Sequence, residues 1–312
     1  METFGQLGEL EIVKRLTAGL PTRDDVIVGA GDDCAVVRSG DPAHDLLLKA
    51  DAVIEGRHFA RETVPEKIGR KAVGRVLSDI AAMGGEPAHF LISLVAPAET
   101  SFDRVKQIYA GAFALAGSAG ASLVGGGTAS GPTLELHVFG TGHVPHAKAL
   151  LRSGARPGDV VFVTGDLGGS AAGKHFDFEP RLREGRWIRE SGLATAMIDI
   201  SDGLVTDLQH VADASGAGAT VLEDSVPVSA AARAMRDDRT PLDHALYDGE
   251  DFELLFTVPE EKKTAFIAAW SAAHKLPCTA VGYMTAKAGK VTLLNRDGAS
   301  MTLHGGGFDH FS

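Results

Sequence analysis

Five aspartates in this 312-residue chain stand at the ends of apolar or glycine-rich segments: Asp33, Asp51, Asp79, Asp199 and Asp202. A carboxylate buried alone in such surroundings would take up a proton, because removing its charge from water is costly. Several converging carboxylates instead stay ionised around a hard divalent cation, which prefers oxygen ligands. The placement of the five aspartates therefore predicts a magnesium site that binds polyphosphate.

Three of these aspartates have an alternative explanation in local structure. Asp33 lies in a glycine-rich run, and a solvated turn would also favour Gly and Asp there. Asp79 would alternatively pair with Arg75, four residues earlier on a helix surface. Asp202 follows Ser201 at the start of a predicted helix, and either side chain would serve as its N-cap. Capping does not exclude nucleotide contact, since a helix N-terminus also binds phosphate through its N–H groups.

Helical spacing favours burial of Asp79. Ala72, Val76, Asp79 and Met83 fall at i, i+4, i+7 and i+11 on one stripe, which we expect to face inward. Asp199 interrupts the apolar strand predicted at 197–200 and is expected to be buried with it.

Hydrophobic periodicity along the chain alternates between two and three to four residues, as in α/β proteins. The patterns predict helices at residues 68–83, 101–119 and 204–214, and strands at 46–51, 90–95, 134–142, 160–164, 197–200 and 252–258. A segment rich in Pro, Gly and basic residues at 143–158 indicates a domain boundary. We therefore expect a layered α/β (α+β) fold with domains at 1–147 and 148–312.

Composition excludes several classes of partner. The chain has 30 Lys and Arg against 41 Asp and Glu, a formal charge of −11, which disfavours nucleic acid and anionic membranes. No apolar run is long enough to span a bilayer. Cys34 and Cys278 form no Cys-x-x-Cys pair and follow no secretory signal. We expect a cytoplasmic protein that acts on small molecules.

Two glycine-rich runs match nucleotide-binding motifs only in part. The run from Gly168 to His175 has nearly the spacing of a P-loop, but His175 stands where a magnesium-binding Ser or Thr is required. A tight turn leading into a helix explains this run more simply. Gly29-x-Gly31 lacks the third glycine and the acidic residue of a dinucleotide fingerprint, so nicotinamide chemistry has poor support.

A series of motifs makes the chain resemble the thiamine-monophosphate kinases, within the aminoimidazole ribonucleotide synthetase-like superfamily. In chain order they are Gly31-Asp32-Asp33-Cys34-Ala35, Asp51 with Gly56-x-His58-Phe59, Leu77-Ser78-Asp79-Ile80-Ala81-Ala82-Met83-Gly84, residues 150–159, Ile198-Asp199-Ile200-Ser201-Asp202-Gly203-Leu204 and Gly249-Glu250-Asp251-Phe252-Glu253-Leu254. The likeness continues to Phe308-Asp309-His310-Phe311.

This resemblance implies transfer of the γ-phosphoryl group of ATP to the phosphate of thiamine monophosphate, giving thiamine diphosphate. It also implies that the N-terminal sheet pairs with its twin in a homodimer. Several Mg²⁺ ions would be held by Asp33, Asp51, Asp79, Asp199 and Asp202. ATP would contact Gly126, Arg152 and Ser201. Thiamine phosphate would contact His58, Glu250 and Phe308, although Phe308 would alternatively be a C-terminal anchor in the core.

The implied reaction needs charge neutralisation more than proton transfer. The acceptor phosphate oxygen is already anionic at neutral pH, so no general base is expected and His58 need only position it. Two unit negative charges about 4 Å apart repel by roughly 4 kcal/mol at a protein-like effective dielectric. Magnesium bridging the β- and γ-phosphates would neutralise this charge and align the in-line attack.

The sequence departs from the family pattern at its metal-binding positions. Lys49 and Ala50 precede Asp51 where the family usually has hydroxyl residues, and Gly127 stands where its motif has aspartate. Three explanations are open: catalysis with fewer metal ions, a fixed positive charge from Lys49 in place of one ion, or nucleotide binding without turnover. A sister enzyme of the same fold with another small substrate is a further alternative.

Overall fold

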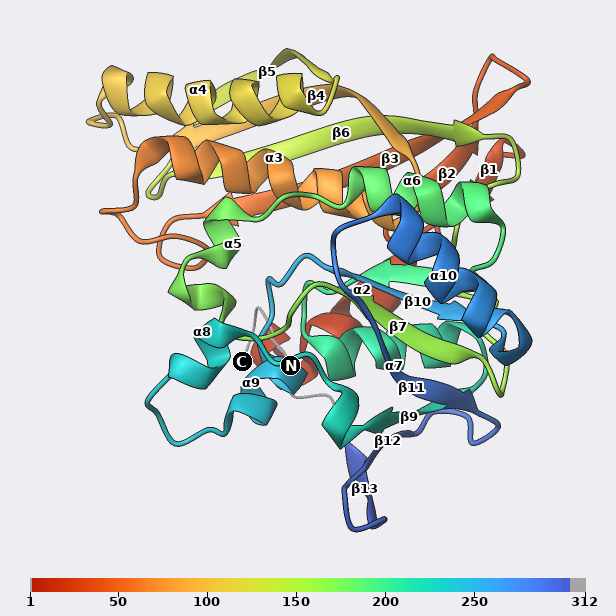
Figure 1. The fold of residues 1–312 in the computed structure, drawn as a ribbon. Coiled ribbons are helices and arrows are strands. Elements are labelled where there is room, and N and C mark those ends of the chain that lie inside the picture. Colours follow the sequence, from red (N-terminus) through yellow and green to blue (C-terminus); the bar gives the residue numbers. More distant parts are fainter. Residues whose placement is uncertain (1, 304–312) are drawn as a thin grey trace.

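Two mixed β-sheets organise residues 2–303, the part of the chain that this computed structural model describes (Figure 1). The first sheet has the strand order β1-β2-β3-β6-β4-β5. Its strands are β1 (Val26–Val28), β2 (Ala35–Arg38), β3 (His44–Ile54), β4 (Glu86–Ala96), β5 (Ser122–Ser130) and β6 (Glu135–Pro145). Neighbouring strands are antiparallel except β4 and β5, which are parallel.

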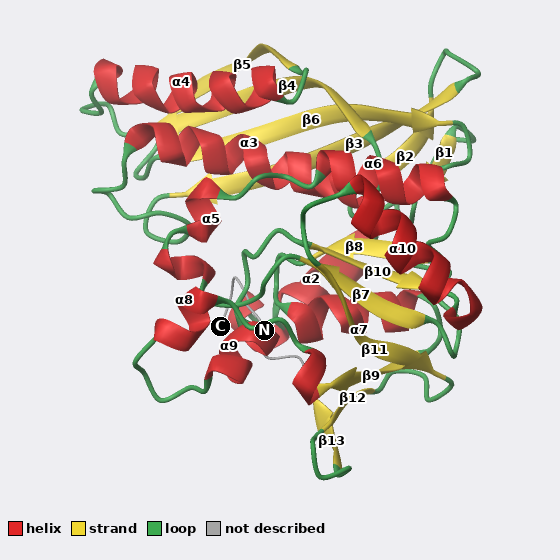
Figure 2. Ribbon diagram, viewed as in Figure 1, coloured by secondary structure: helices red, strands yellow, loops and turns green. Residues whose placement is uncertain are grey.

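Two long helices, α3 (Pro65–Ala82) and α4 (Phe102–Ser118), cover one face of the first sheet (Figure 2). Strand β3 shows how alternation assigns side chains to the two faces. Leu47 and Val53 are buried in the core that contains the apolar residues of α3, whereas Ala50 is exposed on the opposite face. Lys49 and Asp51 alternate with Ala50, so they point toward α3.

The two helices pack backbone against backbone at a pair of glycines. A Cβ built on Gly69 would lie 1.8 Å from the Ile108 carbonyl oxygen, and one on Gly111 would lie 1.9 Å from that of Glu66. Any side chain at either position would force the helices apart. Glycine at these two positions therefore fixes the depth of α3 against α4, and with it the side chains that α3 carries.

The second sheet has the strand order β13-β12-β9-β11-β7-β10-β8. Its strands are β7 (Val160–Thr164), β8 (Ala196–Asp199), β9 (Gly218–Leu222), β10 (Leu254–Val258), β11 (Cys278–Thr285), β12 (Val291–Leu294) and β13 (Ser300–Leu303). All five residues of β7 are buried. Val161 and Val163 belong to the core around α7 (Leu204–Ala214), and Phe162 belongs to the core around α10 (Lys263–Ala273).

Shorter elements complete the fold. The remaining helices are α1 (Phe4–Leu7), α2 (Glu9–Thr17), α5 (Lys174–Asp177), α6 (Leu182–Ser191), α8 (Ala230–Ala234) and α9 (Pro241–Tyr247). Single 3-10 turns occur at Ser170–Ala172, Glu223–Ser225 and Glu260–Lys262. Helix α6 packs on α3, since a Cβ on Gly185 would lie 2.1 Å from the Ala81 carbonyl oxygen. Among residues 2–303, no helix combines the length and apolarity needed to cross a bilayer.

The predicted elements agree with the structure to within a few residues at most ends, and the two-domain α/β class is confirmed. The strand predicted at 252–258 begins at Leu254, because Glu250 and Phe252 adopt positive φ angles of 63° and 51°. The run from Gly168 forms a turn into a 3-10 helix rather than a P-loop helix, with Gly168 and Gly169 both at positive φ. The predicted boundary between residues 147 and 148 stays a prediction.

Candidate active site

Three buried aspartates from distant parts of the chain converge on one point. Asp33 lies in the loop between β1 and β2, Asp79 lies near the end of α3, and Asp199 ends β8. Carboxylate oxygens from the three lie within 4.8 Å of one another, and the residues are 1%, 7% and 3% exposed. We call Asp33, Asp79 and Asp199 the acidic triad. Two of its members, Asp33 and Asp79, come from elements of the first sheet and the helices that cover it, and Asp199 comes from the second sheet.

Burial and mutual repulsion govern the charge of the triad. Burial, reinforced by the Asp33 carboxylate, raises the pKa of Asp199 to about 7, although the Ser78 hydroxyl opposes this by donating a 2.5 Å hydrogen bond. Burial likewise raises the pKa of Asp79 well above its usual range, and Asp199 adds to the shift. The triad is therefore an unfavourable place for three negative charges unless cations join it.

The oxygen atoms present fit a hard divalent cation. Asp33 Oδ1 accepts hydrogen bonds from Arg152 at 2.5 and 3.1 Å, but its Oδ2 is buried and has no hydrogen-bond partner among the described residues. A buried carboxylate oxygen left in this way is costly unless something pairs with it. Magnesium coordinates carboxylate oxygens of this kind.

Lys49 already places one positive charge at the triad. Its ammonium lies 2.8 Å from Asp79 Oδ1, on the side of β3 that faces α3. Burial acts to lower the pKa of Lys49, but Asp79 and Asp51 outweigh it and raise that pKa above its usual value. The alternative pairing of Asp79 with Arg75 does not form, because Arg75 reaches across to Asp51.

Asp51 lies beside the triad in an ion pair of its own. Arg75 Nε donates to Asp51 Oδ2 at 2.7 Å. Burial acts to raise the pKa of Asp51, but the Arg75 charge outweighs it and the pKa is lowered. Asp51 was predicted as a metal ligand, and this role stays a prediction because Arg75 holds its carboxylate in this structure.

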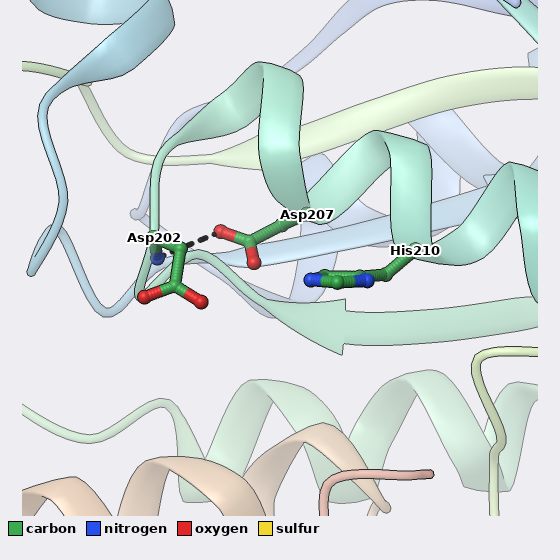
Figure 3. A group of neighbouring side chains, drawn as sticks. All are labelled: Asp202, Asp207 and His210. Atoms are coloured by element: carbon green, nitrogen blue, oxygen red, sulfur yellow. Dashed lines mark hydrogen bonds between the residues drawn. The ribbon is translucent and has the colours of Figure 1, made fainter. Parts of the chain in front are cut away.

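A second group of possible ligands surrounds the start of α7. Asp202, Asp207 and His210 each bring a ligand atom within 4.8 Å of the others (Figure 3). The Asp207 carboxylate accepts a hydrogen bond from the Asp202 backbone N–H at 3.0 Å. The prediction that Ser201 or Asp202 caps α7 is wrong, because Gly203 is the N-cap residue and contributes no side chain.

The predicted substrate contacts His58 and Glu250 lie on either side of a buried lysine. Lys71 Nζ donates to the His58 carbonyl at 2.8 Å and to Glu250 at 2.7 Å. Burial acts to raise the pKa of Glu250, but His175, Lys71 and Arg75 together lower it to about 2. The carboxylate is therefore ionised throughout the neutral range.

Sequence reasoning missed several of these side chains. Lys71, Arg75 and Ser78 recur at i, i+4 and i+7 along α3 and form a polar stripe beside the apolar one. That spacing was a usable signal. No local sequence pattern indicated a role for His175 or Asp207. The partner of His175 is Glu250, which is distant in the sequence, and the partner of Asp207 is the Asp202 backbone, which precedes the first turn of α7.

The predicted ATP contacts occupy two separate places. Arg152 joins the triad through Asp33, and the Ser201 carbonyl accepts a hydrogen bond from the Glu250 N–H at 2.7 Å. Gly126 lies on β5, three strands from Asp51 in the same row of the sheet, a separation of about 14 Å. It lines a hollow of about 430 Å³ with aromatic walls from Tyr109 and Phe113. Phe308 lies outside the described residues.

Comparison with known proteins covers nearly the whole chain. Residues 31–144 match the family model described as AIR synthase related protein, N-terminal domain, and residues 178–294 match its C-terminal domain. The thiamine-monophosphate kinase of Salmonella typhimurium is 36% identical, and that of Bacillus subtilis is 33% identical. These alignments cover 98% of this chain and 98% and 100% of those relatives.

Solved structures agree with the sequence comparisons. The structure described as AaThiL complexed with AMPPCP and TMP matches with a TM-score of 0.86 at 31% identity, over 99% of each chain. The thiamine-monophosphate kinase from Stenotrophomonas maltophilia matches with a TM-score of 0.76 at 33% identity, over 93% of this chain and 96% of that one.

Proposed function

Because this chain belongs to the thiamine-monophosphate kinase family, we propose that it transfers the γ-phosphoryl group of ATP to thiamine monophosphate, giving thiamine diphosphate. The observation that carries this proposal is the acidic triad. Its three buried carboxylates come from both sheets' layers, and one of their oxygens has no hydrogen-bond partner among the described residues. Such a group is suited to holding cations between two anionic substrates.

The chain's own residues then have a limited set of tasks. Asp33, Asp79 and Asp199 would hold magnesium, which when bound would neutralise phosphate charge and align the transfer. The acceptor phosphate needs no general base, so His58 and Glu250 orient the substrate. Asp51 and Asp202 are proposed as ligands for further ions. To coordinate an ion, the Asp51 carboxylate would give up its contact with Arg75.

ATP is proposed to contact Arg152, Ser201 and Gly126. Arg152 lies against the triad, where a guanidinium suits phosphate oxygens. The hollow beside Gly126 has the aromatic walls that an adenine ring favours. Gly126 itself tolerates no side chain, since a Cβ there would lie 1.8 Å from the Ile92 carbonyl oxygen.

Lys49 is proposed to substitute for one metal ion as a fixed charge. Its ammonium lies 2.8 Å from the Asp79 carboxylate of the triad. It therefore neutralises the negative charge that a metal ion at that position would otherwise neutralise. Gly127 supplies no ligand of its own, so the site is expected to hold fewer ions than five carboxylates would allow.

A second function is favoured by the same contacts. Lys49 pairs with Asp79, Arg75 pairs with Asp51 and Arg152 pairs with Asp33, so three of the five predicted ligands are already neutralised by protein cations. A protein of this kind would bind nucleotide and thiamine phosphate without transferring the phosphoryl group. It would act as a binding protein rather than an enzyme.

A cytoplasmic homodimer is the assembly we propose. The uncovered face of the first sheet carries adjacent apolar side chains, since Phe139 pairs in register with Ala50 on one side and Leu91 on the other. Phe139 is 36% and Leu91 39% exposed. A second copy would bury this patch. Light scattering of the purified protein should give twice the 32.5 kDa chain mass, and a value of one chain mass would contradict the dimer.

Turnover of the purified protein tests the function. With ATP, magnesium chloride and thiamine monophosphate, we expect stoichiometric thiamine diphosphate and ADP, resolved by chromatography. The Asp199→Asn variant should lose at least about a hundredfold in rate, because a triad ligand is removed. Binding of both ligands without product would support the binding-protein alternative. ADP release with another small acceptor, but not with thiamine monophosphate, would indicate a sister enzyme.

A further inference from the structure

Lys71 is a fully buried lysine on α3 whose ammonium joins groups from both halves of the chain. Its Nζ donates to the backbone carbonyl of His58 at 2.8 Å and to the Glu250 carboxylate at 2.7 Å. It also lies 2.9 Å from Nδ1 of His175 on α5. Its side chain is 0% exposed, so these contacts take place away from bulk water.

These contacts use the whole hydrogen-bonding capacity of the ammonium. A lysine ammonium has three N–H donors and no acceptor, and the His58 carbonyl, Glu250 Oε1 at 2.7 Å and Glu250 Oε2 at 2.8 Å supply three acceptors. The ring of Phe176 lies 5.1 Å from Nζ and closes another side. Lys71 therefore has no N–H left for a ligand.

Glu250, in contrast, is partly open to a ligand. Its carboxylate oxygens accept from Lys71 at 2.7 and 2.8 Å and lie 3.1 Å from Arg75 Nη1 and 3.0 Å from His175 Nδ1, so a ligand would reach the carboxylate at its exposed edge. The Glu250 side chain is 23% exposed. Its backbone has a φ of 63°, which is costly for a residue with a Cβ and persists only where surrounding contacts hold it.

We propose that Lys71 is a positioning residue of the thiamine phosphate site. It holds the His58 backbone and the Glu250 carboxylate at one fixed separation, and it does so without touching the ligand. The inference rests on the proposed function, in which His58 and Glu250 contact thiamine monophosphate. Removing the ammonium leaves His58 and Glu250 in the protein, but it removes the group that links the His58 backbone to the Glu250 carboxylate.

The neighbouring Lys67 gives a matched control. It lies one helical turn before Lys71 on α3, and its Nζ forms a 2.7 Å ion pair with Asp177 of α5. Lys67→Met and Lys71→Met thus both remove a lysine that ties α3 to α5. Only Lys71→Met removes a contact to His58 and Glu250.

Calorimetric titration of the full-length protein tests the proposal, with thiamine monophosphate and, separately, a non-hydrolysable ATP analogue with magnesium. We expect Lys71→Met to weaken the Kd of thiamine monophosphate by about tenfold and that of the ATP analogue by less than about twofold. Lys67→Met should stay within about twofold of the wild type for both ligands. In turnover assays Lys71→Met should raise KM for thiamine monophosphate more than it lowers kcat.

Three results would overturn the proposal. The first is an unchanged Kd of thiamine monophosphate in Lys71→Met. The second is an equal loss of affinity for thiamine monophosphate and for the ATP analogue, which a purely structural role predicts. If Lys71→Met does not fold, His175→Ala removes the imidazole that contacts both the Lys71 ammonium and the Glu250 carboxylate. It should weaken thiamine monophosphate binding by about threefold, and unchanged binding there is the third. A wild type that binds no thiamine monophosphate defeats the proposed function itself, and the proposal falls with it.

Discussion

Burial and neighbouring charges together set the charge of each carboxylate at the site. The Asp199 and Asp79 side chains are deprived of water and face one another, so their pKa values rise, whereas Asp51 and Glu250 face arginine and lysine and their pKa values fall. At Asp51 and Glu250 the neighbouring cations outweigh burial, whereas at Asp79 the charge of Lys49 does not. Lys49 is the protein cation that reaches the triad at Asp79.

The raised pKa of Asp199 predicts how pH affects stability without metal. A carboxylate with a pKa of about 4 in the unfolded chain and about 7 in the folded one binds its proton more tightly when folded. Its stabilising contribution is complete below about pH 4 and is lost as the pH rises through about 7. Asp199→Asn stays neutral, so in EDTA its thermal midpoint should exceed that of the wild type by several degrees at pH 7.5 and match it near pH 4.

Two comparisons check this assignment. Lys49→Met should have the opposite effect at pH 7.5, because it removes the charge that compensates Asp79, while Met at the exposed Lys106 of α4 should change little. Saturating magnesium should reduce the advantage of Asp199→Asn. A constant difference between Asp199→Asn and the wild type across the pH range would contradict a raised pKa for Asp199.

Residue types and local spacing predicted part of the site. The stripe of Ala72, Val76, Asp79 and Met83 placed Asp79 inward, and the apolar strand around Asp199 predicted its burial; all are buried. Local spacing could not predict partners across the fold. Arg75 faces Asp51 rather than Asp79, and this depends on the depth at which α3 sits over β3.

At the scale of elements, α3 carries most of the site. Within three turns it presents Lys71, Arg75, Ser78 and Asp79, which contact the His58 carbonyl, Asp51, Asp199 and Lys49 respectively. The position of these side chains depends on the close approach of α3 to α4. The apolar periodicity predicted both helices, but the glycine contacts between them could be seen only in the structure.

Substituting two glycines of α4 distinguishes the effect of helix packing on stability from the effect of helix propensity. Gly111→Ala should destabilise the protein by about 1–3 kcal/mol, because the new Cβ would collide with the Glu66 carbonyl. Gly117→Ala should stabilise it by up to about 1 kcal/mol, since nothing lies within 4 Å of a Cβ there and alanine favours helix. Urea unfolding measures both. Equal effects of the two substitutions would show that the α3–α4 contact is looser than described.

At the scale of the whole molecule, the site exists only because two layers meet. Asp33 and Asp79 belong to the layer of the first sheet, and Asp199 belongs to the second sheet. The motifs in the sequence indicated which aspartates belong together, but not that Asp51 and Asp202 lie beside the triad in separate groups. Gly126, a proposed ATP contact, lies three strands away from Asp51, so the predicted nucleotide contacts are spread well beyond the carboxylates.

The most direct test is the position of a divalent ion in a crystal grown with an ATP analogue and manganese, located by anomalous scattering. We predict a peak within about 2.2 Å of carboxylate oxygens from Asp33, Asp79 and Asp199, with Lys49 still beside Asp79. The peak should disappear in Asp199→Asn. Bound nucleotide with no ion among these three side chains would contradict the account.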